Sequence, residues 1–387
     1  MKFNVLTAGA MAAGIAVAAD ADTIRVGVIM PASGTFATYG EQFRDGIETY
    51  QAMHGTTAGE HEIEFLFRDS GGPNAEQARA LAQELLIREQ VDYLAGFTFT
   101  PNALAVAPLI EQSQTPAVIF NAATSSITQE SGFFLRTGYT LWQVSAPMAE
   151  WALAQGYDEV VTAVSDYGPG LDAEAGFRTA FEAGGGTITD QIRMPLDTTD
   201  FAPFMQRVRG AEPQALFTFL PAGALTYAFV KSYSENGLHE EGIVLLGTGE
   251  TEEVTLPALG DAALGLNTAF HYSPTHESDA NAAFLDALAG VRADAVANFA
   301  TVGAFDGAHV IYEMVAAAGA DGPAAIKAAK GLSWESPRGP VSLDPETRHL
   351  TQNVYIRVVE RDADGALVNA EIETIAAVPD LGLVSDY

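Results

Sequence analysis

The sequence predicts an α/β fold class, with two doubly wound parallel-sheet lobes joined by three hinge crossings. Apolar, strand-like runs alternate with helical segments along the chain, which is the pattern of a parallel sheet covered by helices. The alternation forms two successive series of similar size, and 387 residues are enough for two domains of roughly 150 residues each. Because no Pro/Gly/Ser linker separates the two series, we expect the chain to cross between the lobes at residues 136–140, 268–273 and 344–352.

The first series opens with the apolar run "IRVGVIM", which predicts a buried strand. The later segment "AEQARALAQELLIRE" has apolar residues at helical spacing and predicts an amphipathic helix. The expected strands are residues 24–30, 62–67, 91–96 and 117–120, and the expected helices are residues 40–54, 75–89 and 103–112.

The second series repeats this alternation and is followed by a mixed C-terminal part. The expected helices are residues 141–155, 171–183, 201–209 and 225–235, and the strands that follow them are residues 159–164, 187–192, 215–220 and 243–247. A strand at 266–272, helices at 281–288 and 296–318, and β-like segments at 353–360 and 366–375 complete the prediction. We therefore expect lobe I to comprise residues 23–138 and 270–346, and lobe II residues 139–269 and 347–387.

The N-terminus resembles a secretory signal peptide, for which we expect residues 1–19. Lys2 precedes an uncharged, Ala- and Gly-rich stretch, and the small residues Ala16-Val17-Ala18 favour cleavage after Ala18 or Ala19. The stretch is too weakly apolar for a permanent membrane span. An ordinary N-terminal helix is the alternative.

The composition excludes several classes of function. Asp and Glu number 50 against 19 Lys and Arg, a net charge of −31, so nucleic acid and anionic membranes would repel the chain. Adaptation to a salty medium is the alternative explanation of this charge. The chain has no cysteine, which excludes disulfides, thiolate catalysis and cysteine metal sites.

Hydroxyl residues stand where two neighbouring predicted strands end, in "GFTFTPNA" (residues 96–103) and "FNAATSS" (residues 120–126). In the first segment Thr100 is the expected helix N-cap, and Pro101 the first helical residue. Helix starts leave backbone N–H groups unpaired and partially positive, so two such turns predict half of a site for a small anion. Thr98, Thr100 and Thr124 are its candidate hydroxyl contacts, with simple helix capping as the alternative role.

The loops of the second series would face this site. They comprise residues 165–168, 221–224 and 248–250, because ligands of parallel α/β sheets bind beyond the carboxyl ends of the strands. Tyr167 could pack on a ligand, and Glu250 could hold a cationic group.

Catalytic signatures are scarce. The sequence has no G-x-S-x-G elbow and no Walker loop, and "GTGE" is not a dinucleotide fingerprint. The spacing of His271 and His276 matches no helical metal pair, so we expect no metal and no cofactor. An enzyme using Asp166 or Glu250 as a base, as in a hydrolase or deaminase, is the alternative to a non-enzymatic binding protein.

The chain resembles the type I periplasmic solute-binding proteins, in the leucine/isoleucine/valine-binding branch that serves ABC importers. The resemblance covers the chain in order after the signal segment. The carrying segments are "IRVGVIMPASGTFATYGEQFRDGIE", "AGFTFTPNALAVAPLIEQSQTPAVIFNAATSSIT", "VSDYGPGLDAEAGF", "FLPAGALTYAFVKSYSENGL", "FDGAHVIYE" and "WESPRGPVSLDPETRHLTQNVYI".

The resemblance implies a ligand trapped between two closing lobes and a carboxylate site at Thr100, Ala122 and Thr124. It also implies ligand contact for the aromatic residues Tyr39 and Tyr167. The implied protein is periplasmic, monomeric, free of cofactors and served by a membrane ABC permease. The implied ligand is a small carboxylate, with a branched-chain amino acid as the leading expectation.

Two departures concern recognition of an amino group. Amino-acid binders of the family place an acidic residue where this chain has Gly249, with Glu250 one position on, and an aromatic residue where it has Pro221. Phe97, Phe99 and Tyr39 would suit an apolar or aromatic tail, so an aromatic acid or an amide- or urea-type solute is the alternative ligand. A sensor ectodomain or a cytoplasmic amide-responsive regulator is a further alternative.

Overall fold

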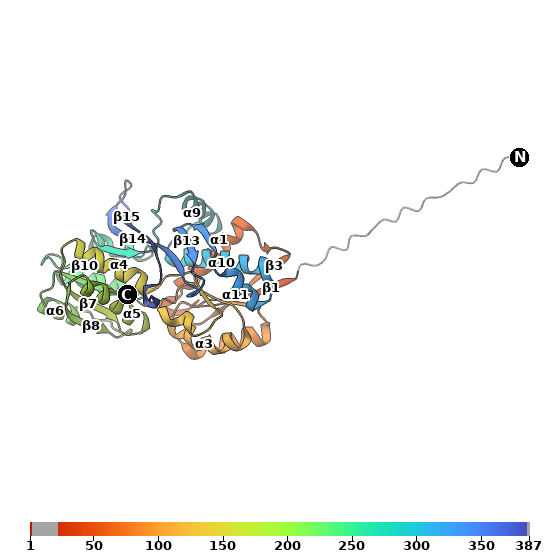
Figure 1. Ribbon diagram of the computed structural model, residues 1–387. Helices are drawn as coiled ribbons and strands as arrows, with labels where there is room; N and C mark the ends of the chain where they lie inside the picture. The colour runs from red at the N-terminus through yellow and green to blue at the C-terminus, as the bar shows by residue number, and fades with distance from the viewer. Residues whose placement is uncertain (2–21, 385–387) are drawn as a thin grey trace.

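A six-stranded sheet forms the centre of the N-terminal half in the computed structural model, which describes Met1 and residues 22–384 (Figure 1). The strand order is β2-β3-β1-β4-β5-β6, parallel except where β2 meets β3. The strands are β1 (Thr23–Met30), β2 (Thr57–Ala58), β3 (His61–Asp69), β4 (Tyr93–Gly96), β5 (Ala117–Ile119) and β6 (Phe134–Arg136).

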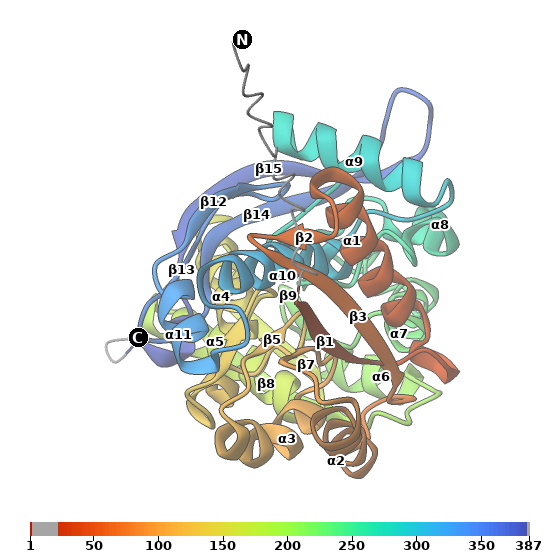
Figure 2. The same cartoon turned by 90° about the vertical axis from the view of Figure 1, so that its right-hand side faces the viewer.

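Helices cover both faces of this sheet, as Figure 2 shows. On one face α1 (Thr38–His54) packs on α10 (Phe299–Ala318), with α9 (Asp279–Val291) and α11 (Gly322–Ala329) beside them. On the other face lie α2 (Ala75–Glu84), which continues as the π-helical segment η2 (Leu85–Glu89), and α3 (Thr100–Ser113). The two C-terminal helices α10 and α11 therefore complete the half that begins with β1.

Two glycines let α10 approach the sheet closely. A Cβ at Gly303 would lie 2.6 Å from the Phe120 carbonyl oxygen, and one at Gly307 would lie 2.1 Å from the Phe120 ring. Any larger residue would therefore push α10 away from β5. The helix starts cleanly because its N-cap, Asn298, accepts hydrogen bonds from the N–H groups of Ala300 and Thr301.

A nine-stranded mixed sheet forms the second half. Its order is β12-β13-β14-β11-β10-β9-β7-β8, with β15 paired to β14. The strands are β7 (Glu159–Ser165), β8 (Thr187–Met194), β9 (Ala215–Phe219), β10 (Val244–Gly247), β11 (Asn267–Phe270), β12 (Ser333–Ser336), β13 (Gly339–Leu343), β14 (Leu350–Arg361) and β15 (Leu367–Val378). The helices of this half are α4 (Leu141–Ala154), α5 (Gly168–Ala183), α6 (Ala202–Gly210), α7 (Ala224–Glu235) and α8 (Leu256–Leu259).

The fold class predicted from the sequence is confirmed, and most expected strands and helices are present. Six strands and helices were not expected, namely β2, β6, α8, α11, β12 and β13. The strand β13 pairs with β14 of the second sheet, and β12 pairs with β13, although both strands follow helices that pack on the first half. The boundaries of the two lobes therefore stay a prediction.

The expected N-cap at Thr100 is wrong by one residue. The N-cap of α3 is Phe99, in extended conformation, and Thr100 is the first helical residue. The Phe99 side chain has no polar group with which to cap the helix, and the Thr100 hydroxyl hydrogen bonds to that of Thr124.

The predicted signal peptide, residues 1–19, lies outside the described residues except for Met1. Among the helices of the described part, none combines the length and the apolar character needed to cross a membrane.

Candidate ligand-binding cavity

A cavity lies where the two halves meet, at the carboxyl ends of parallel strands, a common place for a small-molecule site. Its walls come from the carboxyl ends of strands in both sheets and from the chain between β6 and α4. The lining residues are Tyr39, Thr98, Phe99, Asn121, Ala123, Tyr139, Tyr167, Pro169, Phe219, Leu220, Pro221, Ala222, Gly249, Phe270 and Phe299.

Six α-helices of the described residues begin at this cavity. They are α1, α3, α4, α5, α7 and α10, and each starts within two residues of a lining residue, namely Tyr39, Phe99, Tyr139, Tyr167, Ala222 and Phe299 respectively. The N-terminus of a helix carries a partial positive charge, so the cavity suits an anion although none of the described residues that line it has a charged side chain. This local positive charge is needed because the chain as a whole has a net charge of −31, and its overall field would repel an anion.

The loops after β4 and β5 offer free polar groups to an anion. The backbone N–H groups of Thr98 and Ala123 make no hydrogen bond to another described residue. The Thr98 hydroxyl and the Asn121 carboxamide oxygen are buried and also lack a partner in the described part of the chain. The Asn121 side chain donates to the Thr98 carbonyl at 2.8 Å, which ties the two loops together.

Thr100 and Thr124, the predicted carboxylate contacts, lie next to each other, but they lie beside the cavity and do not line it. Their hydroxyl oxygens are 2.9 Å apart and buried. Gly168, at the start of α5, lies against them from the second half: a Cβ there would be 3.2 Å from Thr124 Oγ1. Beneath the turn, the buried Arg136 donates to the Thr124 carbonyl at 2.7 Å and keeps a cation there. Ligand contact by this pair stays a prediction.

The predicted contacts Phe97 and Ala122 lie in the core behind the cavity. Phe97 is fully buried, with a positive φ of 59°, and its ring packs edge-on against Phe134. Ala122 donates its N–H to the Phe97 carbonyl at 2.9 Å. Both residues shape the turns that present Thr98 and Ala123, and neither lines the cavity.

The predicted contacts of the second half divide in the same way. Tyr167 and Pro221 line the cavity, and Gly249 lines it next to Glu250. Glu250 itself is buried, and its carboxylate accepts hydrogen bonds from the N–H groups of Leu220 and Thr248. Burial raises the pKa of Glu250 to about 7, against these hydrogen bonds. The Glu250 carboxylate therefore links the ends of β9 and β10 through these two hydrogen bonds.

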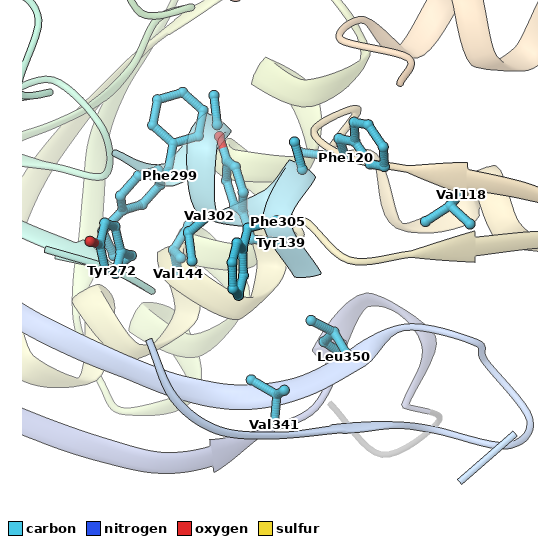
Figure 3. Packing of buried hydrophobic residues seen from close by; sticks show 14 of the residues in the cluster. Val118, Phe120, Tyr139, Val144, Tyr272, Phe299, Val302, Phe305, Val341 and Leu350 are labelled. Atoms are coloured by element: carbon cyan, nitrogen blue, oxygen red, sulfur yellow. The ribbon is translucent and has the colours of Figure 1, made fainter. Parts of the chain in front are cut away.

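Aromatic rings form most of the cavity wall. Tyr39 packs edge-on against Phe99 and Phe299, with ring centroids 6.1 and 5.9 Å apart. Tyr139 packs edge-on against Phe270 and Phe299, at 4.9 and 6.1 Å, and Figure 3 shows it among the buried side chains around Phe299.

Several lining residues were missed by sequence reasoning. The missed residues are Asn121, Ala123, Tyr139, Pro169, Phe219, Leu220, Ala222, Phe270 and Phe299. Tyr139 and Phe270 fall inside the segments 136–140 and 268–273, which were expected to cross between the lobes. Because a cleft between two lobes has the crossings as its base, aromatic residues within these segments were the available signal.

The side chains considered for catalysis do not converge. Asp166 is exposed at the end of β7, and His276 hydrogen bonds to Glu371 at 3.0 Å. His271 is buried and stacked on Tyr139, with ring centroids 4.8 Å apart. No group of three or more His, Asp or Glu side chains suited to a metal is found within residues 22–384.

The two halves also touch beside the cavity through a carboxylate. Asp172 of α5 accepts the N–H of Ser125 at 2.8 Å. Burial raises the pKa of Asp172 to about 6, and the nearby Asp380 acts in the same direction, while Arg136 and the Ser125 N–H oppose the shift. His349, 3.0 Å from Asp380, is buried too, and its pKa is lowered by burial, so it adds no charge at neutral pH.

This pKa shift predicts that replacing Asp172 with asparagine stabilises the protein at neutral pH. The ionised carboxylate is disfavoured in the folded chain, so its cost is absent below about pH 4, grows between pH 4 and 6, and is complete above pH 6. Asparagine keeps the acceptor for Ser125 without the charge. We expect the Tm of Asp172→Asn to exceed that of the wild type by a few degrees at pH 7 and to match it near pH 4.

Thermal unfolding between pH 4 and 8 checks this prediction. Asp197 is exposed, so Asp197→Asn serves as the control and should leave the Tm unchanged at every pH. A lower Tm of Asp172→Asn at pH 7 would mean that the charge itself holds the contact.

Comparison with known proteins places the chain in a family. The family model "Periplasmic binding protein" matches residues 23–366. The Leu/Ile/Val-binding protein homolog 6 of Brucella abortus is 48% identical over 387 residues, which cover 99% of each chain.

Solved structures agree with this placement. An ABC-transporter solute-binding protein from Rhodopseudomonas palustris HaA2, in complex with p-hydroxybenzoic acid, is 48% identical with a TM-score of 0.92. One from Rhodopseudomonas palustris BisB5, in complex with 3,4-dihydroxybenzoic acid, is 43% identical with a TM-score of 0.89. Each match covers 94% of this chain and all of the other. The resemblance recognised in the sequence is thereby confirmed: the chain belongs to the periplasmic binding protein family and is a solute-binding component of an ABC transporter.

Proposed function

We propose that this chain binds an aromatic carboxylate of the benzoate type. The observation that carries the proposal is the cavity wall, which has seven aromatic side chains and no charged one: Tyr39, Phe99, Tyr139, Tyr167, Phe219, Phe270 and Phe299. A flat ring fits between such walls with edge-on and stacked contacts. The free N–H groups of Thr98 and Ala123 and the surrounding helix starts would hold the carboxylate.

The similar solute-binding proteins support this ligand class. The two from Rhodopseudomonas palustris, at 48% and 43% identity, bind p-hydroxybenzoic acid and 3,4-dihydroxybenzoic acid. At such identity over the full domain, the wall residues of the cavity are expected to be similar in kind. We therefore favour an aromatic acid over the other ligands that the sequence allows.

A branched-chain amino acid is the second candidate. It is favoured by the sequence prediction and by the 48% identical relative from Brucella abortus, a Leu/Ile/Val-binding protein homolog. Its ammonium group, however, would be buried where no carboxylate lines the cavity, since Glu250 is turned to backbone N–H groups. Burying an unpaired charge is costly, which lowers the expected affinity for any amino acid.

In the cell, the proposed protein is exported through its signal segment and acts in the periplasm, where it delivers its solute to a membrane permease. It acts there as a monomer and without turnover of the solute. The lining residues offer no nucleophile paired with a base, in keeping with a binding role.

A panel of acids tests the proposal on the purified protein. We expect benzoate or 4-hydroxybenzoate to raise the Tm by several degrees, because ligand at 100 times Kd stabilises the folded state by about 2.7 kcal/mol. The sharpest comparison pairs 4-hydroxyphenylacetate with 4-hydroxyphenylglycine, which differ by the amino group alone. The acid without the amino group should bind more tightly in calorimetry. Stabilisation by leucine or valine and by no aromatic acid would overturn the proposal.

A further inference from the structure

A buried acid stands behind the tyrosines of the cavity without a defined partner. Glu252 is 1% exposed, and neither carboxylate oxygen has a hydrogen-bond partner in the described part of the chain. Burial raises the pKa of Glu252 well above its ordinary value, and neighbouring Glu253 adds to the shift. Arg357 and the Asn298 side chain oppose it without cancelling it. Burial therefore favours the protonated form of the Glu252 carboxyl group, which can donate one hydrogen bond and accept others.

Two tyrosines bring this acid into relation with the cavity. Tyr39 and Tyr139 line the cavity and flank the same ring, Phe299, at 5.9 and 6.1 Å between centroids. The residue before Phe299 is Asn298, whose side chain neighbours Glu252. The N–H of Glu252 donates to the carbonyl of Gly249, a residue that lines the cavity, at 3.2 Å. Burial raises the pKa of both tyrosines, and Glu252 adds to both shifts.

Several polar groups around Tyr39, Tyr139 and Glu252 have unfilled hydrogen-bonding capacity. The Tyr39 hydroxyl has the Ala222 backbone N–H as its neighbour. The Asn298 amide nitrogen is buried without a partner among the described residues. A buried polar group without a partner costs free energy, so such a cluster beside a cavity suits a ligand that brings a polar group of its own.

We propose that Tyr39, Tyr139 and Glu252 form a hydroxyl-recognition corner, which selects aromatic acids with a ring hydroxyl over their unsubstituted analogues. This inference rests on the proposed aromatic-acid function and refines it. A ring hydroxyl both donates and accepts, so it can bridge a tyrosine hydroxyl and the carboxyl group of Glu252. Benzoate would leave the corner groups unpaired after displacing water from them, and that loss discriminates against it.

The test compares one pair of ligands across matched variants. Calorimetry gives the ratio of the Kd of benzoate to the Kd of 4-hydroxybenzoate for the wild type, Tyr39→Phe, Tyr139→Phe and Glu252→Gln. We expect a ratio of about 10 or more in the wild type. Either tyrosine variant should lower the ratio several-fold, mainly by weakening the binding of 4-hydroxybenzoate. In Glu252→Gln the amide keeps a donor and an acceptor, so a smaller change is expected.

Tyr272→Phe is the control for the loss of a buried hydroxyl. Tyr272 is also buried, but its hydroxyl donates to Asn281 at 2.9 Å and lies outside the cavity lining. This variant should lose stability and keep the wild-type ratio, which separates recognition from folding.

The outcomes distinguish this inference from the proposed function. A wild-type ratio near 1, with both acids bound, overturns the corner and leaves the aromatic-acid function intact. A high wild-type ratio that no variant changes also overturns the proposed corner, because other groups would then recognise the ring hydroxyl. Binding of neither acid overturns the proposed function and this inference together.

Discussion

Replacing Arg338 with methionine is expected to lower the free energy of unfolding by about 3–5 kcal/mol. Arg338 is fully buried and forms an ion pair with Asp306 of α10, which is fully buried as well. Methionine fills much of the same volume but carries no donor. The loss would leave Asp306 as a buried charge with only the Trp334 indole and the Ser336 hydroxyl as donors.

The effect is large because Arg338 joins segments that are far apart in the sequence. Its guanidinium donates to the carbonyls of Thr137 and Gly138, where the chain passes from β6 to α4. It also donates to the Val302 carbonyl in α10 and to the Gln352 side chain in β14. These groups would lose their partner in a region that water cannot reach, and each unsatisfied group adds to the cost.

Chemical denaturation of Arg338→Met and of the wild type at one pH measures this difference. Arg207→Met is the matched control, since Arg207 makes a two-bond contact with Asp190 on the surface and is 52% exposed. The control should change stability by less than about 1 kcal/mol. Equal effects of the two variants would show that the buried pair contributes no more than a surface pair.

The parts of the fold with a clear period were predictable from the sequence. The strands β1, β4, β5, β7 and β9 are short apolar runs, and α1, α2, α4, α5 and α7 carry helical spacing. The hairpin β12–β13 was missed because "WESPRGPVSL" contains two prolines and a glycine, which ordinarily indicate a loop. Pairing with β14 determines its conformation, and that contact is not local in sequence.

Five of the side chains proposed from the sequence line the cavity, namely Tyr39, Thr98, Phe99, Tyr167 and Pro221, whereas Phe97 and Ala122 face the core. The sequence indicates the turns after β4 and β5 but does not tell which residues of each turn face the cavity. Ligand contact by the lining residues stays a prediction. Phe270 and Phe299 come from segments more than 100 residues away from these turns. Only the packing of the two halves brings them together, and no local pattern encodes that packing.

The largest effect on ligand binding is expected from Gly168→Leu. Gly168 is the first residue of α5, and its Cα faces Thr124 and Thr100 of the other half. A Cβ there would lie 3.2 Å from Thr124 Oγ1 and 3.4 Å from Thr100 Cγ2, which is already tight. The remaining atoms of leucine would have to occupy space that the first half fills. The variant should therefore hold the two halves apart without disturbing the core of either.

We expect Gly168→Leu to weaken binding of 4-hydroxybenzoate by about 100-fold or more, because a ligand held by one half alone loses the contacts of the other. The Tm of the protein without ligand should change little. Gly210→Leu is the control, since nothing lies within 4 Å of a Cβ at that position.

X-ray scattering with and without ligand then tests the cause of the lost affinity. If the halves close on the ligand, the wild type and Gly210→Leu should contract on binding and Gly168→Leu should not. Wild-type affinity in Gly168→Leu would mean that the cavity binds its solute without this contact between the halves. Lost affinity with normal contraction would instead mean that leucine disturbs the start of α5, and with it one of the helix ends expected to hold the carboxylate.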